Sequence, residues 1–223
     1  MDTNKTTTRK RKSSAQARGN VRRALLVTAG KSLLAENSIE SISLADVAKE
    51  ADIPLGSVYH FFPKINNLLA EIARQFGEDI LEAVFKPLTL EADDNWPVLI
   101  RKCVDRAVKL YKENIAYQQL MISGKTPAEI KLSDRENDAV IGQQVAALLD
   151  KHFELGDLTN KDQVFFHVVE IIDLMLMLSV NKHGEITDTM TEEAKRAAIA
   201  YLKCYLPDYL PTRLISENSA TEM

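Results

Sequence analysis

The chain has 223 residues, of which 45% are hydrophobic and 27% are charged, and its formal net charge at pH 7 is −4. This composition is ordinary for a soluble protein and accommodates either one large domain or a small domain followed by a larger one. With only two cysteines, the chain has neither a disulfide framework nor the ligand spacing of a metal site, and a reducing cytoplasm is expected.

Residues typical of helices dominate the chain. Leu, Ala, Glu and Lys recur at helical spacing, alternating runs of Val, Ile and Thr are absent, and only eight Gly and seven Pro occur. This pattern predicts an all-α protein. The N-terminus is polar, which argues against a signal peptide, and the most apolar run, residues 171–180, is too short to cross a bilayer. We therefore expect a cytoplasmic protein with no membrane partner.

The charge is divided unevenly along the sequence, with a basic N-terminal segment and an acidic remainder. Residues 1–23 contain eight basic residues and one acid, 8 − 1 = +7, whereas the remainder contains 20 basic and 31 acidic residues, 20 − 31 = −11. A basic arm on an acidic body indicates a polyanionic partner at one end, the alternative being a solubilising or cloning-derived tail. We predict that residues 1–19 are a disordered arm that lies along DNA phosphates or enters the minor groove.

Three short helical segments follow the arm. The first helix is predicted to run from Asn20 to Glu36, with Val21, Leu25 and Leu33 on its buried face. Arg22 lies in its first turn, where the helix dipole disfavours a cation, so a nearby phosphate would compensate it.

The next two helices are predicted to meet at a tight corner. Ser43 and Asp46 form a capping pattern that starts the second helix. Asp52 tolerates a left-handed backbone better than most residues, and Pro54 suits the first position of a third helix that extends to about Phe61. Gly56 near that helix start permits close approach to the floor of the major groove. This pattern predicts a helix-turn-helix domain at residues 20–68.

The same stretch resembles the N-terminal domain of TetR-family transcriptional regulators. The resemblance rests on Val47-Ala48-Lys49-Glu50-Ala51, on the turn Asp52-Ile53-Pro54, and on Tyr59-His60-Phe61-Phe62, and it extends to Leu69. Two features depart from the family pattern. Asp52 stands where the family usually has glycine, and Lys64 lies one residue before the position of the family's phosphate-binding lysine.

The resemblance implies a set of DNA contacts. Ser43 and Tyr59 would bind phosphates, Ala45 would touch a thymine methyl group, and Lys64 would replace the displaced lysine. Against bases or sugars the resemblance places Leu55, Gly56, Ser57 and His60. Because few of these side chains are polar base readers, part of the specificity is expected from DNA shape. Core packing is the competing interpretation for Tyr59 and is preferred for Phe61 and Phe62.

The rest of the chain is predicted to form a larger helical domain, residues 69–207, followed by a flexible tail, residues 208–223. Its helices are expected at about 66–85, 94–114, 115–123, from beyond Pro127 to about 155, 160–182 and 191–205. The resemblance implies that the last two pair with their copies in a second subunit as a four-helix bundle, which predicts a homodimer.

The larger domain is also expected to bind an effector. Its candidate contacts, chosen as soft or polar-tipped side chains, are Trp96, Tyr111, Tyr117, Met121, His167 and Glu170. For each of them, a role in the core or in the subunit interface is the preferred interpretation, and ligand contact is the alternative. Glu170 or Asp173 would meet a cationic ligand, the alternative being that this polar stripe is solvated or bonded across the dimer.

Together these features predict a sequence-specific DNA-binding transcriptional regulator. The resemblance implies a repressor that binds double-stranded DNA as a homodimer and is released by a small apolar or cationic ligand. The alternative is a structural DNA-associated factor without an effector. An enzyme is not expected, because neither Cys103 nor Cys204 has an evident His partner and no phosphate-binding loop or HExxH motif occurs, so we predict no catalytic residue, metal or cofactor.

Overall fold

The computed structural model describes residues 4–91 and 94–213, with side chains from Gln16 onward. Within these residues the regular structure is helical, and the β-type pairing is confined to an isolated bridge between Phe153 and Thr212. This confirms the predicted all-α fold. The helices are α1 (Asn4–Glu36), α2 (Leu44–Glu50), α3 (Leu55–Phe61), α4 (Ile65–Phe85), α5 (Trp96–Glu113), α6 (Ile115–Tyr117), α7 (Ala128–His152), α8 (Lys161–His183) and α9 (Asp188–Leu202), with short turns η1 (Ile39–Ser41) and η2 (Gln118–Ile122).

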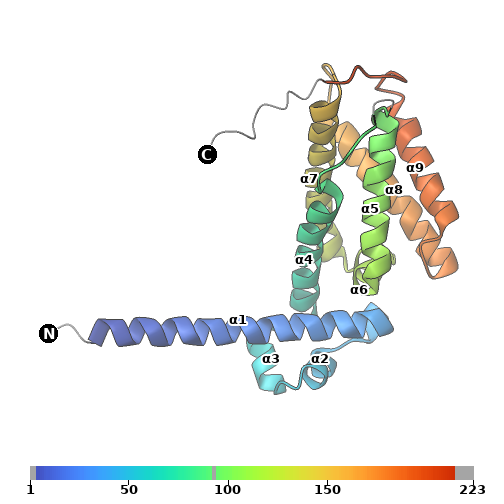
Figure 1. Cartoon of the computed structure of the whole chain (residues 1–223). Coiled ribbons are helices and arrows are strands. Elements are labelled where there is room, and N and C mark those ends of the chain that lie inside the picture. The colour runs from blue at the N-terminus through green and yellow to red at the C-terminus, as the bar shows by residue number, and fades with distance from the viewer. Residues whose placement is uncertain (1–3, 92–93, 214–223) are drawn as a thin grey trace.

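The helices form two packed groups that share α4. The long α1 lies across the base of the molecule with α2 and α3 beneath it, and α5, α7, α8 and α9 stand together above it (Figure 1). Helix α4 begins in the lower group and rises into the upper one. One continuous helix therefore belongs to both groups and joins them.

The first helix begins at Asn4, so the predicted start and N-cap at Asn20 are wrong. Residues 4–19 contain no proline, and Lys, Arg, Gln and Ala favour helix, so extending an existing helix avoids a new nucleation cost. Over residues 4–19 the helical backbone also differs from the predicted disordered arm, while residues 1–3 lie outside the described residues.

The buried face of α1 is displaced from the predicted one. Leu26 and Leu34 are fully buried, whereas Val21 and Leu25 are exposed. The small domain closes instead around Leu26, Val47, Val58, Phe62 and Leu68, each at most 1% exposed. The preferred core role of Phe62 is therefore confirmed, and Phe61 is half-buried against the same core.

Two glycines allow close helix crossings in the larger domain. A Cβ atom at Gly77 of α4 would lie 3.0 Å from the amide of Asn137 on α7. A Cβ atom at Gly142 of α7 would lie 2.8 Å from the backbone of Phe165 on α8. Helix α7 therefore packs backbone to backbone on α8 at Gly142, which sets the distance between these two helices.

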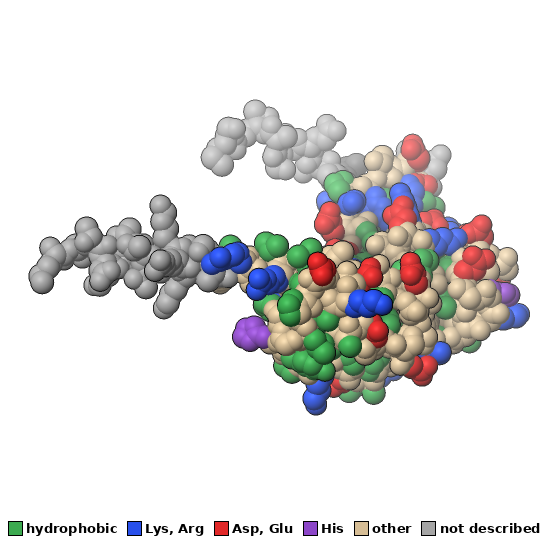
Figure 2. Space-filling view, turned by 90° about the horizontal axis from the view of Figure 1, so that it is seen from below, with side chains coloured by type: hydrophobic (Ala, Val, Ile, Leu, Met, Phe, Trp, Pro, Cys, Tyr) green, Lys and Arg blue, Asp and Glu red, His purple; other side chains and the backbone are tan. Residues whose placement is uncertain are grey.

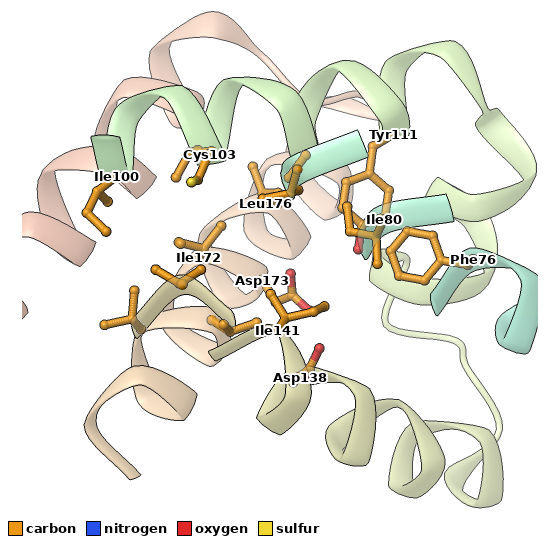
Figure 3. Close-up of a pocket in the computed structure, with 16 residues that line it drawn as sticks. Phe76, Ile80, Ile100, Cys103, Tyr111, Asp138, Ile141, Ile172, Asp173 and Leu176 are labelled. Atoms are coloured by element: carbon orange, nitrogen blue, oxygen red, sulfur yellow. The ribbon is translucent and has the colours of Figure 1, made fainter. Parts of the chain in front are cut away.

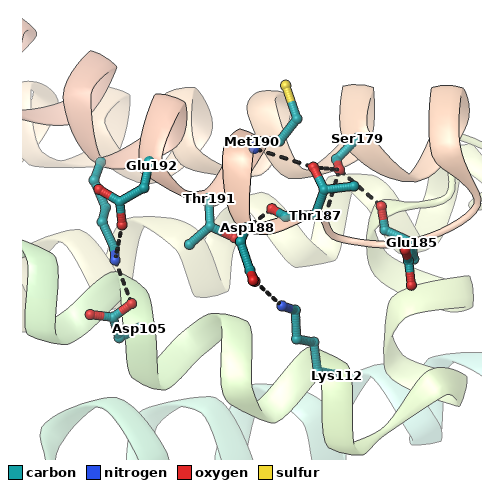
Figure 4. Close-up of polar contacts among 10 residues, drawn as sticks. Asp105, Lys112, Ser179, Glu185, Thr187, Asp188, Met190, Thr191 and Glu192 are labelled. Atoms are coloured by element: carbon teal, nitrogen blue, oxygen red, sulfur yellow. Dashed lines mark hydrogen bonds and ion pairs between the residues drawn. The ribbon is translucent and has the colours of Figure 1, made fainter.

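A polar network fixes the turn between α8 and α9 (Figure 4). The Ser179 hydroxyl donates to the Glu185 carbonyl at 2.8 Å and accepts from the Thr187 N–H at 3.0 Å. The Thr187 hydroxyl in turn accepts from the Met190 N–H at 3.2 Å and caps α9. This cap explains why α9 begins at Asp188 rather than at the predicted Thr191.

Two ion pairs join α9 to α5. Lys112 of α5 pairs with Asp188 at 2.8 Å, and Lys195 of α9 pairs with Asp105 at 2.5 Å.

The chain after α9 packs back onto the larger domain as far as Arg213. The Trp96 indole donates to the Pro207 carbonyl at 2.9 Å, Leu210 is buried, and Arg213 pairs with Asp150 at 2.9 Å. The predicted flexible tail is therefore wrong for residues 208–213, because Leu210 fills an apolar site that the sequence pattern does not reveal. Residues 214–223 lie outside the described residues.

Helix α8 has the length and apolar composition of a membrane-crossing helix within the described residues. Burial accounts for only part of this apolar surface, since Leu174 and Leu178 are 48% and 46% exposed. Single helices of this kind also occur in the cores of soluble proteins, so the match by composition is weak evidence for a membrane span.

Candidate DNA-binding face and effector cavity

A capping box starts α2 as predicted. The Ser43 hydroxyl accepts from the Asp46 N–H at 3.3 Å, and the Ser43 N–H donates to the Asp46 carboxylate at 2.9 Å. The Ser43 hydroxyl also donates to that carboxylate at 2.6 Å. These hydrogen bonds hold the pKa of Asp46 below its ordinary value. In the free protein the Ser43 hydroxyl proton is therefore directed to Asp46, and a phosphate would compete with that carboxylate for it.

The corner between α2 and α3 uses a left-handed residue. Asp52 has φ of 52°, which confirms the predicted left-handed position, and the Ile53 N–H donates to the Ala48 carbonyl at 3.0 Å. Pro54 is the N-cap of α3, one position before its predicted place, and its carbonyl accepts from the Ser57 N–H at 2.8 Å. The corner thus presents the first turn of α3 outward.

Most of the predicted DNA contacts are exposed to solvent. Ser57 is partly buried, and the others, namely Arg22, Ser43, Ala45, Leu55, Gly56, Tyr59, His60 and Lys64, are exposed. Tyr59 is 52% exposed although it is aromatic, so core packing does not account for it. Figure 2 views the molecule from below and shows hydrophobic side chains gathered over the helix-turn-helix with Lys and Arg side chains beside them.

An apolar cavity lies between α4, α5, α7 and α8. The centre of a water-sized sphere can occupy about 60 Å³ of it, and all the space between its walls, including the part that opens to solvent, is about 620 Å³. Its walls are mainly aliphatic and aromatic, with the carboxyl groups of Asp138 and Asp173 at one side (Figure 3). The lining residues include Phe76, Ile80, Ile100, Cys103, Val104, Tyr111, Ile141, Val168, Ile172 and Leu176. Concave apolar sites with a few polar groups are typical of small-molecule binding.

Aromatic contacts lead from this cavity to α1. Phe76 stacks on Tyr111 with ring centroids 5.2 Å apart, and it meets Tyr117 edge to face at 5.3 Å. The Tyr117 hydroxyl accepts from Lys31 of α1 at 2.5 Å and donates to Asp79 of α4. Burial, partly offset by the charge of Asp79, lowers the pKa of Lys31. The cavity wall is therefore linked to the small domain through residues that touch one another.

Family comparison accounts for both groups of helices. Residues 26–72 match the model of bacterial regulatory proteins of the tetR family. Residues 94–205, half of the chain, match the model of the tetracyclin repressor-like C-terminal domain.

The chain is a member of the TetR family.

Solved structures share the fold of this TetR-family protein along most of its length. A TetR-family transcriptional regulator from Streptomyces coelicolor is 22% identical, with a TM-score of 0.65 and coverage of 83% of this chain and 98% of that chain. The multidrug binding protein EbrR complexed with ethidium is 21% identical, with a TM-score of 0.57 and coverage of 81% and 98%. The dihydroxyacetone kinase operon activator DhaS is 17% identical, with a TM-score of 0.53 and coverage of 83% and 98%. A search of curated proteins finds no match.

Membership of the TetR family makes this protein a DNA-binding transcriptional regulator. Helices α2 and α3 form the helix-turn-helix, and α4 joins this motif to the domain that contains the cavity. The departures in the motif have structural consequences. Asp52 takes the left-handed conformation where the family usually has glycine, and Lys64 is the exposed N-cap of α4, its N–H donating to the Asn67 side chain at 3.0 Å.

Of the six predicted effector contacts in this TetR-family protein, Tyr111 lines the cavity and the other five do not. Trp96 and Met121 are buried in the core, and Tyr117 lies behind Phe76. The Nδ1 atom of His167 is hydrogen-bonded to the Tyr201 hydroxyl at 2.8 Å. Glu170 forms an ion pair with Arg135 at 3.5 Å. The sequence does not show how each helix is rotated, so it could not show that these five side chains lie away from the cavity.

The sequence interpretation missed Asp134 and Asp138. They lie four residues apart in the polar stretch 131–138, which reads as a solvated helix face, yet both are at most 3% exposed. Carboxylates at positions i and i+4 share one face of a helix, and this spacing was the available signal. Asp173, the other proposed partner of a cation, does line the cavity.

Proposed function

We propose that this TetR-family protein is a repressor that binds a two-fold symmetric operator as a homodimer and is released by a small molecule in the α4–α8 cavity. The observation that carries the proposal is the contact path from the cavity wall through Tyr117 to α1. An effector that binds the released arrangement more tightly than the DNA-competent one shifts the population toward release.

The homodimer is proposed from the outer face of α8 and α9. Leu174 and Leu178 of α8 are exposed one helical turn apart, and Tyr205 beyond α9 is 45% exposed. A two-fold interface between copies of these helices would cover this apolar surface. It would place two α3 helices in successive major grooves, about 34–36 Å apart.

The proposed DNA contacts follow from exposure and residue chemistry. Tyr59, Ser43 and Lys64 would bind phosphates, whereas Leu55, Gly56, Ser57 and His60 would lie against base edges and sugars, with Ala45 at a thymine methyl group and Arg22 at the flanking backbone. The basic residues of the α1 arm would add salt-dependent affinity, because each neutralised phosphate releases counterions.

The cavity favours an effector-regulated protein over the effectorless structural factor. One chain supplies its lining from α4, α5, α7 and α8, and that lining is mainly apolar. The solved structure of EbrR, which shares the fold, contains ethidium. We therefore propose a small apolar or cationic effector for this protein as well.

Footprinting on the DNA that flanks the protein's own gene tests the proposed function, with and without candidate effectors. A symmetric footprint that disappears when an effector is added is expected. Transcription from the footprinted promoter should rise when the gene is deleted. A fall in transcription would instead make the protein an activator and would refute the repressor assignment. DhaS, which shares the fold, is described as an activator.

Tyr59→Ala is expected to reduce operator affinity by about tenfold or more, because each half-site would lose a hydrogen bond to a charged phosphate. Gel-shift titration measures this change. Tyr209→Ala is the matched control, since Tyr209 is 65% exposed and lies after α9. Equal affinity of the Tyr59 variant and the wild type would remove Tyr59 from the DNA contacts.

Tyr117→Phe is expected to lower the free energy of unfolding by about 1–3 kcal/mol, because it removes a hydroxyl that bonds both Lys31 and Asp79. Urea denaturation measures the change, and hydrogen exchange should show earlier opening of α1 relative to α4. Tyr209→Phe, at a tyrosine that is 65% exposed, should leave both measurements unchanged. An undisturbed α1 in the Tyr117 variant would show that this contact does not hold the two helix groups together.

A further inference from the structure

Three carboxylic acids meet beside the cavity. Asp134 and Asp138 of α7 and Asp173 of α8 each offer a carboxylate oxygen, and these oxygens lie within 4.8 Å of one another. Asp134 has a partner of its own, since Lys131 approaches its carboxylate at 2.9 Å. The remaining pair, Asp138 and Asp173, lines the cavity itself.

Asp138 has an unmet bonding requirement. Its side chain is 3% exposed, and its Oδ2 atom has no hydrogen-bond partner among the described residues. Figure 3 shows the Asp138 carboxyl group directed from α7 toward Asp173 at the cavity wall. A buried polar atom without a partner is costly, and a buried unpaired charge is more so. A proton or a cation supplied from the cavity would relieve this cost at Asp138.

The charges around this pair do not balance. Helix α7 contributes Lys131, Asp134, Arg135 and Asp138, and α8 contributes Glu170 and Asp173. Fully ionised, these groups sum to 2 − 4 = −2. The other ionisable groups at the cavity are Tyr111 and Cys103 of α5, and burial raises the pKa of both, so they stay neutral; the side chains from α4 are apolar.

The excess negative charge is relieved by protons when the cavity is empty. Burial, followed by the charges of Asp173 and Asp134, raises the pKa of Asp138 to about 9. Burial, followed by the charge of Asp134, raises the pKa of Asp173 to about 7. At neutral pH Asp138 is thus a carboxylic acid, and a cation that enters beside it displaces its proton.

The cavity walls decide which kind of cation fits. Next to the two carboxyl groups the lining is apolar, with Phe76, Ile80 and Ile172 around the space. A hydrated inorganic ion has no apolar surface that could pack against these walls. An apolar body that carries one ammonium group matches both the walls and the carboxyl groups.

We propose that Asp138 and Asp173 bind the ammonium group of an amphiphilic organic cation whose apolar body fills the cavity, and that one carboxyl proton passes to solvent as the cation enters. This rests on the proposed function in that the same cavity holds the effector. The exchange is balanced, since one positive charge enters as another leaves and no covalent bond between heavy atoms changes. Because a proton is released, affinity for the cation rises with pH below the pKa of Asp138.

Calorimetric titration of the full chain without DNA tests this site. The probe is 4-phenylbutylammonium, and the matched uncharged ligand is 4-phenylbutanol. At pH 8 the ammonium compound is expected to bind about ten- to a hundredfold more tightly than the alcohol. Between pH 6 and pH 8 its affinity is expected to rise by up to about tenfold per unit, whereas the alcohol should show no such rise. Titrations in phosphate and in Tris should differ in heat because a proton is released.

Asp138→Asn isolates the carboxyl group, because asparagine keeps the shape and cannot release a proton. It should reduce the preference for the ammonium compound about tenfold and abolish the buffer-dependent heat, with binding of the alcohol retained. Glu136→Gln is the control, since Glu136 lies exposed on the same helix and the change removes the same charge. Retained alcohol binding shows that the variant is folded.

The proposal is overturned if the alcohol binds wild type as tightly as the ammonium compound, or if Asp138→Asn keeps the preference. Binding of Mn²⁺ that Asp138→Asn abolishes, without ammonium binding, would instead make the cluster an inorganic cation site. Failure of the cation site can be distinguished from failure of the proposed regulatory function, because operator binding is measured separately. An ammonium compound that binds as expected and leaves the operator complex intact supports the cation site and refutes its role in release.

Discussion

Replacing both Leu174 and Leu178 by glutamate is expected to convert the protein from a dimer to a monomer and to reduce operator affinity by about 10²–10⁴-fold. The two leucines are 48% and 46% exposed on α8, one turn apart. Four carboxylates at a closed two-fold interface would lose their hydration without gaining partners. A monomer contacts one half-site, so the affinity that comes from joining two half-sites disappears.

Sedimentation at micromolar concentration measures the dimer, and gel-shift titration measures the operator complex. The matched control is Leu132→Glu, where the leucine is 64% exposed and belongs to α7 rather than to α8 or α9. It should remain dimeric and bind DNA like the wild type. A Leu174/Leu178 variant that stays dimeric would show that another surface joins the subunits.

Gly142→Val is expected to lower the free energy of unfolding by about 3 kcal/mol, the upper part of the range for overpacked sites. A Cβ atom at this position would lie 2.8 Å from the backbone carbonyl carbon of Phe165 and 2.8 Å from the Phe166 nitrogen. Neither atom belongs to a flexible side chain, so α7 must move away from α8. That movement would also widen the cavity wall at Ile141 and Val145, which line it from the same helix.

Urea denaturation measures the effect, with Gly56→Ala as the control. No atom lies within 4 Å of a Cβ placed at Gly56, so alanine there should stabilise α3 by up to about 1 kcal/mol through helix propensity. The same control should weaken DNA binding, because Gly56 faces the proposed groove contact. If Gly142→Val is as stable as the wild type, the close crossing of α7 and α8 does not limit their packing.

Local chemistry alone predicted the helix-turn-helix well. The Ser43–Asp46 capping box and the left-handed Asp52 depend on neighbours within a few residues, so their geometry is determined by the chain around them. The same holds for the two ends of α4, predicted at 66 and 85 and observed at Ile65 and Phe85. Asn20 fails as a helix start for the converse reason, since nothing before it interrupts a helix.

The cavity could not be predicted in the same way. Tyr117 and Met121 have side chains suited to ligand contact, yet rotation of their helical turns directs them into the core. Asp134 and Asp138 have side chains suited to solvent, yet both are buried between helices. Burial depends on which neighbouring helix faces a residue, and helical periodicity specifies a face without naming its partner.

By itself the sequence determined that this protein is helical and that residues 43–61 form the corner of a DNA-binding motif. It also determined that the basic segment lies at the same end of the chain as this motif. These properties depend on contacts between residues close in the chain. The tertiary structure decided which face of α1 is buried, that residues 208–213 pack on the larger domain, and that Asp138 and Asp173 share one wall of an apolar cavity. Each of these depends on helices distant in sequence, whose relative rotation is set by packing at positions such as Gly142.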